Sequence, residues 1–186
     1  MIITISGTAG SGKSTVGKLL AKKLNFKHYS MGDLQRKYAQ ERHLTIEKLG
    51  ELEAKDPSID REVDISQTKL AEKEDNFVID SWLGFHFIKK AFKIFLDVDE
   101  TIGAKRIFDD TKSGRRGSDE KKAETLEEAN AIRKQRMQTN QERWLRYYHV
   151  DFLNLKNYDL LIDTSENNPE TIVNEILAVL NKKNEE

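Results

Sequence analysis

The sequence predicts an α/β fold with a five-stranded parallel sheet and helices on both faces. The first observation is that strand-like apolar runs alternate with stretches of helical spacing. The second is that three runs are continuously apolar, as is typical of strands buried on both sides: Val78-Ile79, Ile94-Phe95-Leu96 and Leu160-Leu161-Ile162. The third is a glycine-rich phosphate-binding pattern directly after the first run.

The predicted elements follow one another in a regular order. Strands are expected at Ile2–Ser6, Lys27–Ser30, Phe77–Asp80, Ala91–Val98 and Tyr158–Asp163. The first helix begins near Lys13, because Val16, Leu19, Leu20 and Leu24 have helical spacing. Pro57 and Pro169 each open a later helix, since proline is favoured at the first helical position. At 186 residues, the chain is expected to form a single domain, residues 1–186.

Residues Gly7–Thr15 match the phosphate-loop pattern G-x-x-x-x-G-K-S. Glycines allow successive backbone N–H groups to point at phosphate oxygens, and the helix that follows adds its positive end. We expect Lys13 to reach the β- and γ-phosphates as a catalytic residue, and Ser14 to bind Mg²⁺. The residues expected to bind ATP are Gly7, Thr8, Ala9, Gly10, Ser11, Gly12, Lys13, Ser14 and Thr15. A glycine-rich turn without a ligand is the alternative, but the strand before and the helix after favour the phosphate loop.

Composition narrows the range of partners. Lys and Arg number 31 against 32 Asp and Glu, so no global charge recruits nucleic acid or an anionic membrane. There is no cysteine, which excludes disulfides and thiolate sites, and the four histidines are scattered without the spacing of metal ligands. The expected partners are small-molecule nucleotides. The protein is expected to be a cytoplasmic monomer that binds no nucleic acid and no membrane.

The absence of other motifs restricts the class of nucleotide-binding protein. The N-K-x-D and D-x-x-G motifs of GTPase switches do not occur in the sequence. A small phosphotransferase fits the remaining pattern, and such an enzyme must hold a second substrate in line with the γ-phosphate. An ATP-binding regulatory or assembly protein with slow turnover remains the alternative from another class.

Arginines are suited to hold the second substrate, because the guanidinium group pairs with phosphate oxygens bidentately. After the second strand, Asp33 is expected to cap a helix that carries Arg36 one turn along. Arg36 would then face the carboxyl end of the sheet, where ligands of open α/β sheets bind. An ordinary exposed arginine is the alternative.

A second group of polar residues lies on the long helix near the C-terminus. Arg133, Arg136, Asn140 and Arg143 are three, four and three residues apart, so they share one face of that helix. The stretch from Ala131 to Arg146 contains five Lys or Arg residues and a single acid, Glu142. A basic stripe of this kind suits a bound polyphosphate, whereas a solvated surface remains the alternative.

Asp80 ends the third predicted strand, beside the expected position of the phosphate loop. A carboxylate at this place can hold Mg²⁺ through its water ligands. A helix cap or turn cap is the alternative role for Asp80.

Two segments interrupt the α/β alternation and are candidates for mobile insertions. The first, residues 31–75, is strongly charged and contains helical patterns around Leu34–Glu41, Ile46–Ala54 and Ile59–Lys73. The second, residues 109–120, carries Arg115 and Arg116 between two glycines and has almost no apolar residue. A plain surface loop would have the same composition as this second segment.

Several of these motifs together resemble the nucleoside monophosphate (NMP) kinases, and most closely the archaeal-type cytidylate kinases. The resemblance covers nearly the whole chain. The matching segments are Gly7–Thr15, Ser30-x-Gly32-Asp33-x-x-Arg36, Asp56-Pro57-x-Ile59-Asp60-x-Glu62-x-Asp64-x-x-Gln67, Arg136, Arg143-Trp144-x-x-x-Tyr148-x-Val150-Asp151 and Tyr158-Asp159-Leu160-Leu161-Ile162-Asp163-Thr164.

This resemblance implies a P-loop, NMP-kinase-like three-layer fold. It divides the chain into a core (residues 1–30, 76–108 and 121–186), an NMP-binding segment (31–75) and a lid (109–120). It also implies transfer of the γ-phosphate of ATP to CMP or dCMP, with Mg²⁺ as the cofactor. Asp33 and Arg36 would lie in the acceptor site, with Arg36 in contact with the acceptor phosphate, and Arg136 and Arg143 would neutralise the transferring phosphoryl group. Asn140 is expected to bind the acceptor, at a position where related kinases carry an acidic residue.

The chain departs from the family pattern at two places. After the third strand it reads Asp80-Ser81-Trp82, where the family usually has Glu-Gly-Arg. Trp82 would stack on a base or pack in the core, and another nucleotide or small acceptor is therefore an open alternative. The lid is also longer, and its arginines Arg115 and Arg116 are candidates to replace the missing charge.

Overall fold

The structure is a computed structural model that describes residues 1–113 and 123–184. Its strands are Ile2–Gly7 (β1), Lys27–Ser30 (β2), Phe77–Asp80 (β3), Phe92–Asp97 (β4) and Leu160–Asp163 (β5). Its helices are Lys13–Leu24 (α1), Met31–Glu41 (α2), Ile46–Glu53 (α3), Pro57–Lys73 (α4), Gly84–Phe87 (α5), Glu100–Lys112 (α6), Leu126–Tyr148 (α7) and Pro169–Asn184 (α8), with a short 3₁₀ turn at Leu155–Asn157. The prediction of an α/β fold is confirmed.

In the described part of the chain, the five strands form one parallel sheet in the order β2-β3-β1-β4-β5. The central strand β1 is buried along its whole length, including its polar residues Thr4 and Ser6. Strand β5 was expected to be buried on both sides, but it lies at the edge of the sheet and Leu161 is exposed. Ile5 of β1 and Ser30 of β2 both pair with Asp80 of β3 in the register of the sheet. The register therefore places Asp80 beside the start of the phosphate loop and the start of α2.

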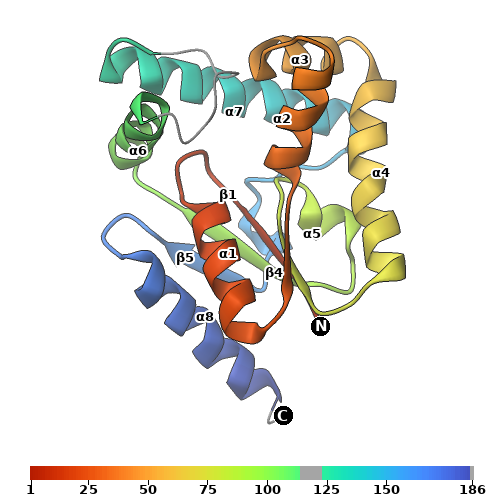
Figure 1. The fold of residues 1–186 in the computed structure, drawn as a ribbon, viewed down its shortest axis with the longest axis vertical. Helices are drawn as coiled ribbons and strands as arrows, with labels where there is room; N and C mark the ends of the chain where they lie inside the picture. Colours follow the sequence, from red (N-terminus) through yellow and green to blue (C-terminus); the bar gives the residue numbers. More distant parts are fainter. Residues whose placement is uncertain (114–122, 185–186) are drawn as a thin grey trace.

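Helices cover both faces of the sheet and make three layers (Figure 1). On one face, α1 and α8 pack on β1, β4 and β5 through a core that includes Ile5, Leu20 and Ile176. On the other face, α4 and α5 pack against β1 and β3 around Phe77 and Ile79. Helix α7 crosses above the carboxyl ends of the strands, from α6 to α3 (Figure 1).

The helix starts follow ordinary capping chemistry. The side chains of Ser30, Thr45, Asp56, Asp99 and Thr125 each accept a backbone N–H at the start of a helix. The expectation that Asp33 caps α2 is wrong. The helix begins at Met31, Ser30 accepts the N–H of Asp33 at 3.3 Å, and Asp33 lies in the first turn.

The two predicted insertions differ in how they fold. Residues 31–75 form α2, α3 and α4 without a strand, as expected from their charge and spacing. The second segment was predicted as a loop from Asp109, but α6 continues to Lys112. Arg115 and Arg116 lie outside the described residues. Of the helices in residues 1–113 and 123–184, none combines the length and hydrophobicity needed to cross a bilayer.

Candidate nucleotide site

The phosphate loop connects β1 to α1 at the carboxyl edge of the sheet. Gly7, Gly10 and Gly12 have φ angles of 147°, 88° and 84°, a region that glycine adopts far more readily than other residues. At Gly10 a Cβ atom would also lie only 2.4 Å from the carbonyl oxygen of Gly103 in α6, whereas at Gly12 it would meet nothing within 4 Å. Position 10 therefore requires glycine because of its backbone conformation and because of the close contact with α6. Position 12 requires glycine only because of its backbone conformation.

This difference gives a matched pair of variants. Gly12→Ala is expected to cost about 1–2 kcal/mol of unfolding free energy, from backbone strain alone. Gly10→Ala carries the same strain and a backbone clash, so we expect it to cost about 1–3 kcal/mol more. Urea unfolding of both variants measures the two costs, and equal losses would contradict the tight contact between the loop and α6.

Two side chains of the loop, Lys13 and Ser14, donate hydrogen bonds to oxygen atoms of the protein. Lys13 Nζ donates to the carbonyl oxygens of Gly7 at 2.9 Å and Thr8 at 2.8 Å, and it lies 4.7 Å from the centre of the Trp82 ring. Ser14 Oγ donates to Oδ1 of Asp80 at 2.9 Å. Thr8 instead uses its hydroxyl to bind Asp97 at 3.0 Å, which ties the loop to β4.

Asp80 accepts hydrogen bonds from three directions. Its Oδ1 accepts from Ser14 and from Ser30, the latter at 3.0 Å, and its Oδ2 lies 2.8 Å from Nε2 of His28. None of these contacts makes Asp80 a helix or turn cap, the alternative role considered above. The carboxylate is buried between the phosphate loop and the start of α2.

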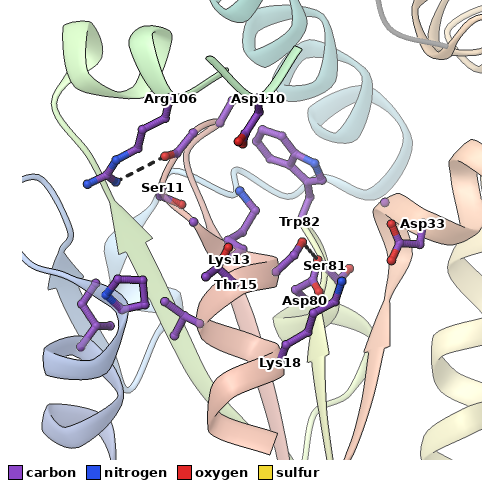
Figure 2. A pocket seen from close by; sticks show the side chains of 18 of the residues that line it. Ser11, Lys13, Thr15, Lys18, Asp33, Asp80, Ser81, Trp82, Arg106 and Asp110 are labelled. Atoms are coloured by element: carbon purple, nitrogen blue, oxygen red, sulfur yellow. Dashed lines mark hydrogen bonds between the residues drawn. The ribbon is translucent and has the colours of Figure 1, made fainter. Parts of the chain in front are cut away.

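A pocket of about 620 Å³ opens over the loop (Figure 2). It is lined by Ala9 and Gly10 through Thr15, together with Asp33, Arg36, Asp80 and Trp82. Gly7 and Thr8, which were also expected to bind ATP, do not line it. Figure 2 shows Lys13 and Trp82 between Arg106 and Asp110 of α6 on one side and Asp33 of α2 on the other. The pocket therefore extends from the phosphate loop to α2.

Arg36 and Asp33 form an ion pair within the first turns of α2. The Arg36 side chain is 26% exposed and lines the pocket, so it is not an ordinary exposed arginine. Both predicted acceptor-binding residues of α2 thus face the phosphate loop across the same cavity.

Arg133 supports the loop rather than lining the pocket. Its Nε donates to the carbonyl oxygen of Ala9 at 2.8 Å, and the side chain is buried beside Gly103. Burial lowers the pKa of Arg133, while the nearby carboxylates of Glu100, Asp97 and Asp99 oppose this shift. The face of α7 that was predicted as a basic stripe is therefore not a solvated surface around Arg133.

A second pocket, of about 650 Å³, lies between α3 and α7. Arg143 and Asn140 of α7 line it and are buried, as is Glu53 of α3. Arg143 Nη1 donates to Oε2 of Glu53 at 2.8 Å, and the two side chains are 2% and 3% exposed. The structure thus places Arg143 away from the phosphate-loop pocket, although we expected it to neutralise the transferring phosphoryl group.

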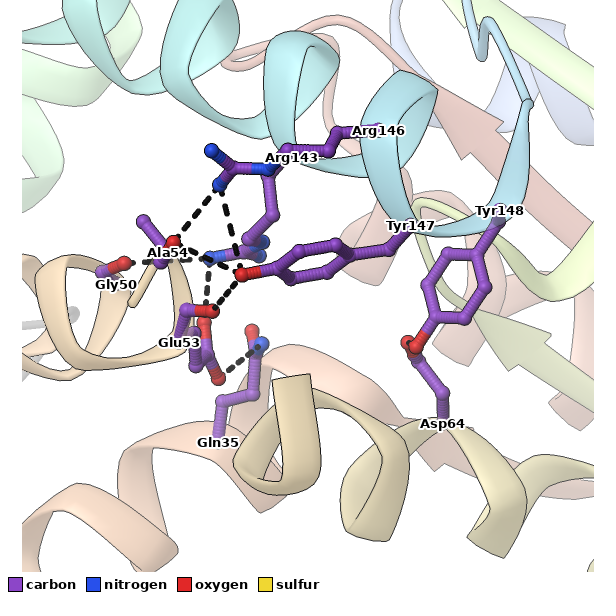
Figure 3. A network of polar contacts seen from close by, with 9 residues as sticks. All are labelled: Gln35, Gly50, Glu53, Ala54, Asp64, Arg143, Arg146, Tyr147 and Tyr148. Carbon is purple, nitrogen blue, oxygen red and sulfur yellow. Dashed lines mark hydrogen bonds and ion pairs between the residues drawn. The ribbon is translucent and has the colours of Figure 1, made fainter. Parts of the chain in front are cut away.

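More contacts join α7 to the end of α3 (Figure 3). The hydroxyl of Tyr147 donates to the carbonyl oxygen of Ala54 at 2.8 Å, and Nη2 of Arg146 donates to the same oxygen at 2.8 Å. Tyr148 binds Asp64 of α4 at 2.8 Å. These contacts satisfy carbonyl groups at the end of α3 and hold α3 and α4 against α7.

Among the residues that the structure describes, Arg136 and Trp82 line both pockets. The Trp82 ring packs edge-on against Phe152, with ring centres 5.1 Å apart, and is tilted against Trp144 at 5.7 Å. Trp82 therefore packs in the core and forms part of the boundary between the pockets at the same time. Arg136 is the predicted catalytic arginine that the structure places where the two pockets meet.

Sequence reasoning missed several residues around the site, among them Arg106 and His28. Arg106 lines the first pocket and donates to the hydroxyl and carbonyl oxygens of Thr164 at 3.1 and 2.7 Å. Its spacing of three from Gly103 and four from Asp110 on α6 is the signal that could have found it. His28 gave no such signal, because only the sheet register brings it to Asp80.

The residues present suit a magnesium ion that is bound mainly by nucleotide phosphates. In the described ranges, no group of three or more His, Cys, Asp or Glu side chains could hold a metal. The Ser14 hydroxyl and the Asp80 carboxylate lie together at the loop and are hard oxygen donors, which Mg²⁺ prefers.

A glycine-rich loop between β1 and α1, at the carboxyl edge of a parallel sheet, defines the class of P-loop nucleotide-binding proteins. Residues 2–166 match the Cytidylate kinase-like family, and the chain belongs to this family. The comparisons with individual proteins agree with this membership.

Among curated relatives, a cytidylate kinase of Sulfolobus acidocaldarius is 36% identical over 99% of this chain and 96% of its own length. An S-adenosylmethionine-dependent nucleotide dehydratase of Lacinutrix mariniflava is 38% identical over 98% of this chain, but the chain spans only 36% of that protein. A shikimate kinase from Bacteroides thetaiotaomicron has a TM-score of 0.64 at 18% identity, covering 97% of this chain and 98% of that one, which supports the fold alone.

Proposed function

We propose that this chain transfers the γ-phosphate of ATP to a nucleoside monophosphate, with CMP or dCMP as the acceptor. The observation that carries the proposal is the pair of adjoining pockets that share Arg136 and Trp82. The first pocket contains the phosphate loop, and the second is formed by the NMP-binding segment and α7. The cytidylate kinases among the relatives favour cytosine as the base of the acceptor.

In this proposal, the phosphate loop and Lys13 bind the triphosphate, and Ser14 and Asp80 hold Mg²⁺, which neutralises phosphate charge. Arg36 binds the acceptor phosphate from α2, and Arg136 stabilises the transferring group between the pockets. Asn140 and Arg143 lie in the second pocket, where they would contact the nucleoside part of the acceptor. No general base is needed, because the attacking phosphate oxygen is already anionic.

A kinase of another nucleotide is the second candidate. The observation that favours it is Trp82, which lies at the boundary of the pockets where related sequences usually carry an arginine. The Lacinutrix relative, whose name refers to a nucleotide dehydratase, matches as strongly as the cytidylate kinases do.

The proposal is tested by incubating the protein with Mg-ATP and a panel of acceptors: CMP, dCMP, UMP, AMP, GMP and shikimate. ADP formation is expected only with a nucleoside monophosphate, and fastest with CMP or dCMP. A preference for another monophosphate would select the second candidate. ATP hydrolysis without an acceptor, or no turnover at all, would contradict the kinase and favour a regulatory ATP-binding protein.

A further inference from the structure

Asp80 connects the two sides of the proposed site. One of its carboxylate oxygens, Oδ1, accepts from Ser14 of the phosphate loop at 2.9 Å and from Ser30 at 3.0 Å. Ser30 also accepts the N–H of Asp33 and so caps α2, the helix that carries Arg36. The orientation of one carboxylate is therefore coupled to the phosphate loop and to the start of the NMP-binding segment.

The other oxygen of Asp80, Oδ2, is held by His28. Nε2 of His28 lies 2.8 Å from Oδ2, and the two side chains are 15% and 6% exposed. A carboxylate only accepts hydrogen bonds, so Nε2 carries the hydrogen. A carboxylate fixed at one oxygen presents its other oxygen in one direction, and this direction is toward Ser14 and Ser30.

Helix α1 is shaped to leave room for this imidazole. Gly17 lies inside α1, where glycine is unfavourable because it loses the most backbone freedom. A Cβ atom at this position would lie 3.0 Å from Nε2 of His28 and 3.2 Å from its Cδ2. Glycine, although unfavourable in a helix, therefore occupies the position of α1 that lies against the His28 ring. This is the ring that contacts Asp80.

We propose that His28 is a positioning residue, which orients the Asp80 carboxylate toward Ser14 and Ser30 and thereby toward the magnesium ion of the nucleotide. The proposal depends on the proposed function only in assigning Mg²⁺ to Ser14 and Asp80. Partners that orient metal-site ligands typically change metal affinity or activity 10- to 100-fold when they are removed.

The test compares His28→Leu with His28→Gln. Leucine removes the hydrogen bond, whereas the glutamine amide keeps an N–H donor near the position of Nε2. Isothermal titration calorimetry measures the affinity for ADP with Mg²⁺ and with EDTA, without any acceptor. The ratio of the two affinities is the enhancement by Mg²⁺.

We expect His28→Leu to reduce this enhancement about 10-fold and His28→Gln to keep most of it. The affinity for ADP in EDTA is expected to stay within about twofold in both variants, because the phosphate loop is unchanged. An unchanged enhancement in His28→Leu would overturn the proposal. An equal loss in both variants would also overturn it, because the effect would then not come from the hydrogen bond.

Gly17→Ala gives an independent test if His28→Leu does not fold. The added methyl group presses on Nε2 while His28, Asp80 and Ser14 keep their chemistry. We expect the enhancement by Mg²⁺ to fall at least threefold, and an unchanged value would overturn the proposal. Because these assays contain no acceptor, an error in the proposed acceptor would leave their outcome unchanged.

Discussion

Lys13→Ala is expected to lower kcat roughly 10²- to 10³-fold, the typical loss when one preorganised donor to a developing charge is removed. Lys13 is the lysine of the phosphate loop, and its ammonium group lies between the loop carbonyls and the Trp82 ring. In the proposed function, this change would remove the charge with which the phosphate loop stabilises the transferring phosphoryl group. ADP formation from Mg-ATP and CMP measures the loss.

Lys22→Ala is the matched control, because Lys22 lies on the same helix in an exposed position. Its kcat is expected to equal that of the unchanged protein. The far-ultraviolet circular dichroism of both variants should also match that of the unchanged protein, which separates loss of catalysis from loss of folding. Full activity of Lys13→Ala would contradict the assignment of the loop to ATP.

Glu53→Leu is expected to lower the free energy of unfolding by about 3–5 kcal/mol, because it leaves the buried Arg143 guanidinium without its carboxylate partner. Glu53 also accepts from Gln35 of α2 at 3.4 Å, so the change is expected to loosen α2 and α3. Urea unfolding monitored by tryptophan fluorescence measures the effect.

Two controls separate the ion pair from the helix. Glu51→Ala removes a carboxylate of the same helix that pairs with Lys48 at the surface, and we expect a cost of about 0.2–1 kcal/mol. The double variant Glu53→Leu/Arg143→Leu removes both charges and is expected to recover most of the stability lost in the single variant. A double variant as unstable as Glu53→Leu would show that loss of the Glu53–Arg143 ion pair is not the cause.

The sheet could be predicted from the sequence because its strands are marked by composition. Runs such as Phe77–Asp80 have few polar residues, and their order along the chain matches the alternation with helices. The predicted cap of α2 was wrong, because Ser30 and Asp33 are both residue types that cap helices well. In the structure the Ser30 hydroxyl accepts the N–H of Asp33 in the first turn.

For the arginines of α7, the sequence predicts the shared helix face but not the contacts that each side chain makes. Helical spacing correctly places Arg133, Arg136 and Arg143 on one face, but their tasks depend on what the rest of the chain brings to that face. Arg133 meets the carbonyl of Ala9, and Arg143 meets Glu53, which is ninety residues away in the sequence. No local sequence pattern predicts a contact between residues so far apart in the sequence.

Helix α7 also fixes the spacing and the rotation between residues that belong to the two pockets. Arg133 supports the phosphate loop and Arg143 lies in the second pocket, ten residues or about 15 Å further along the same rigid helix. Each residue added between them would turn everything that follows by about 100°, and would carry Arg143, Tyr147 and Tyr148 away from their partners. This part of the chain is therefore expected to tolerate substitution far better than insertion or deletion, and α7 acts as a fixed spacer between the two pockets.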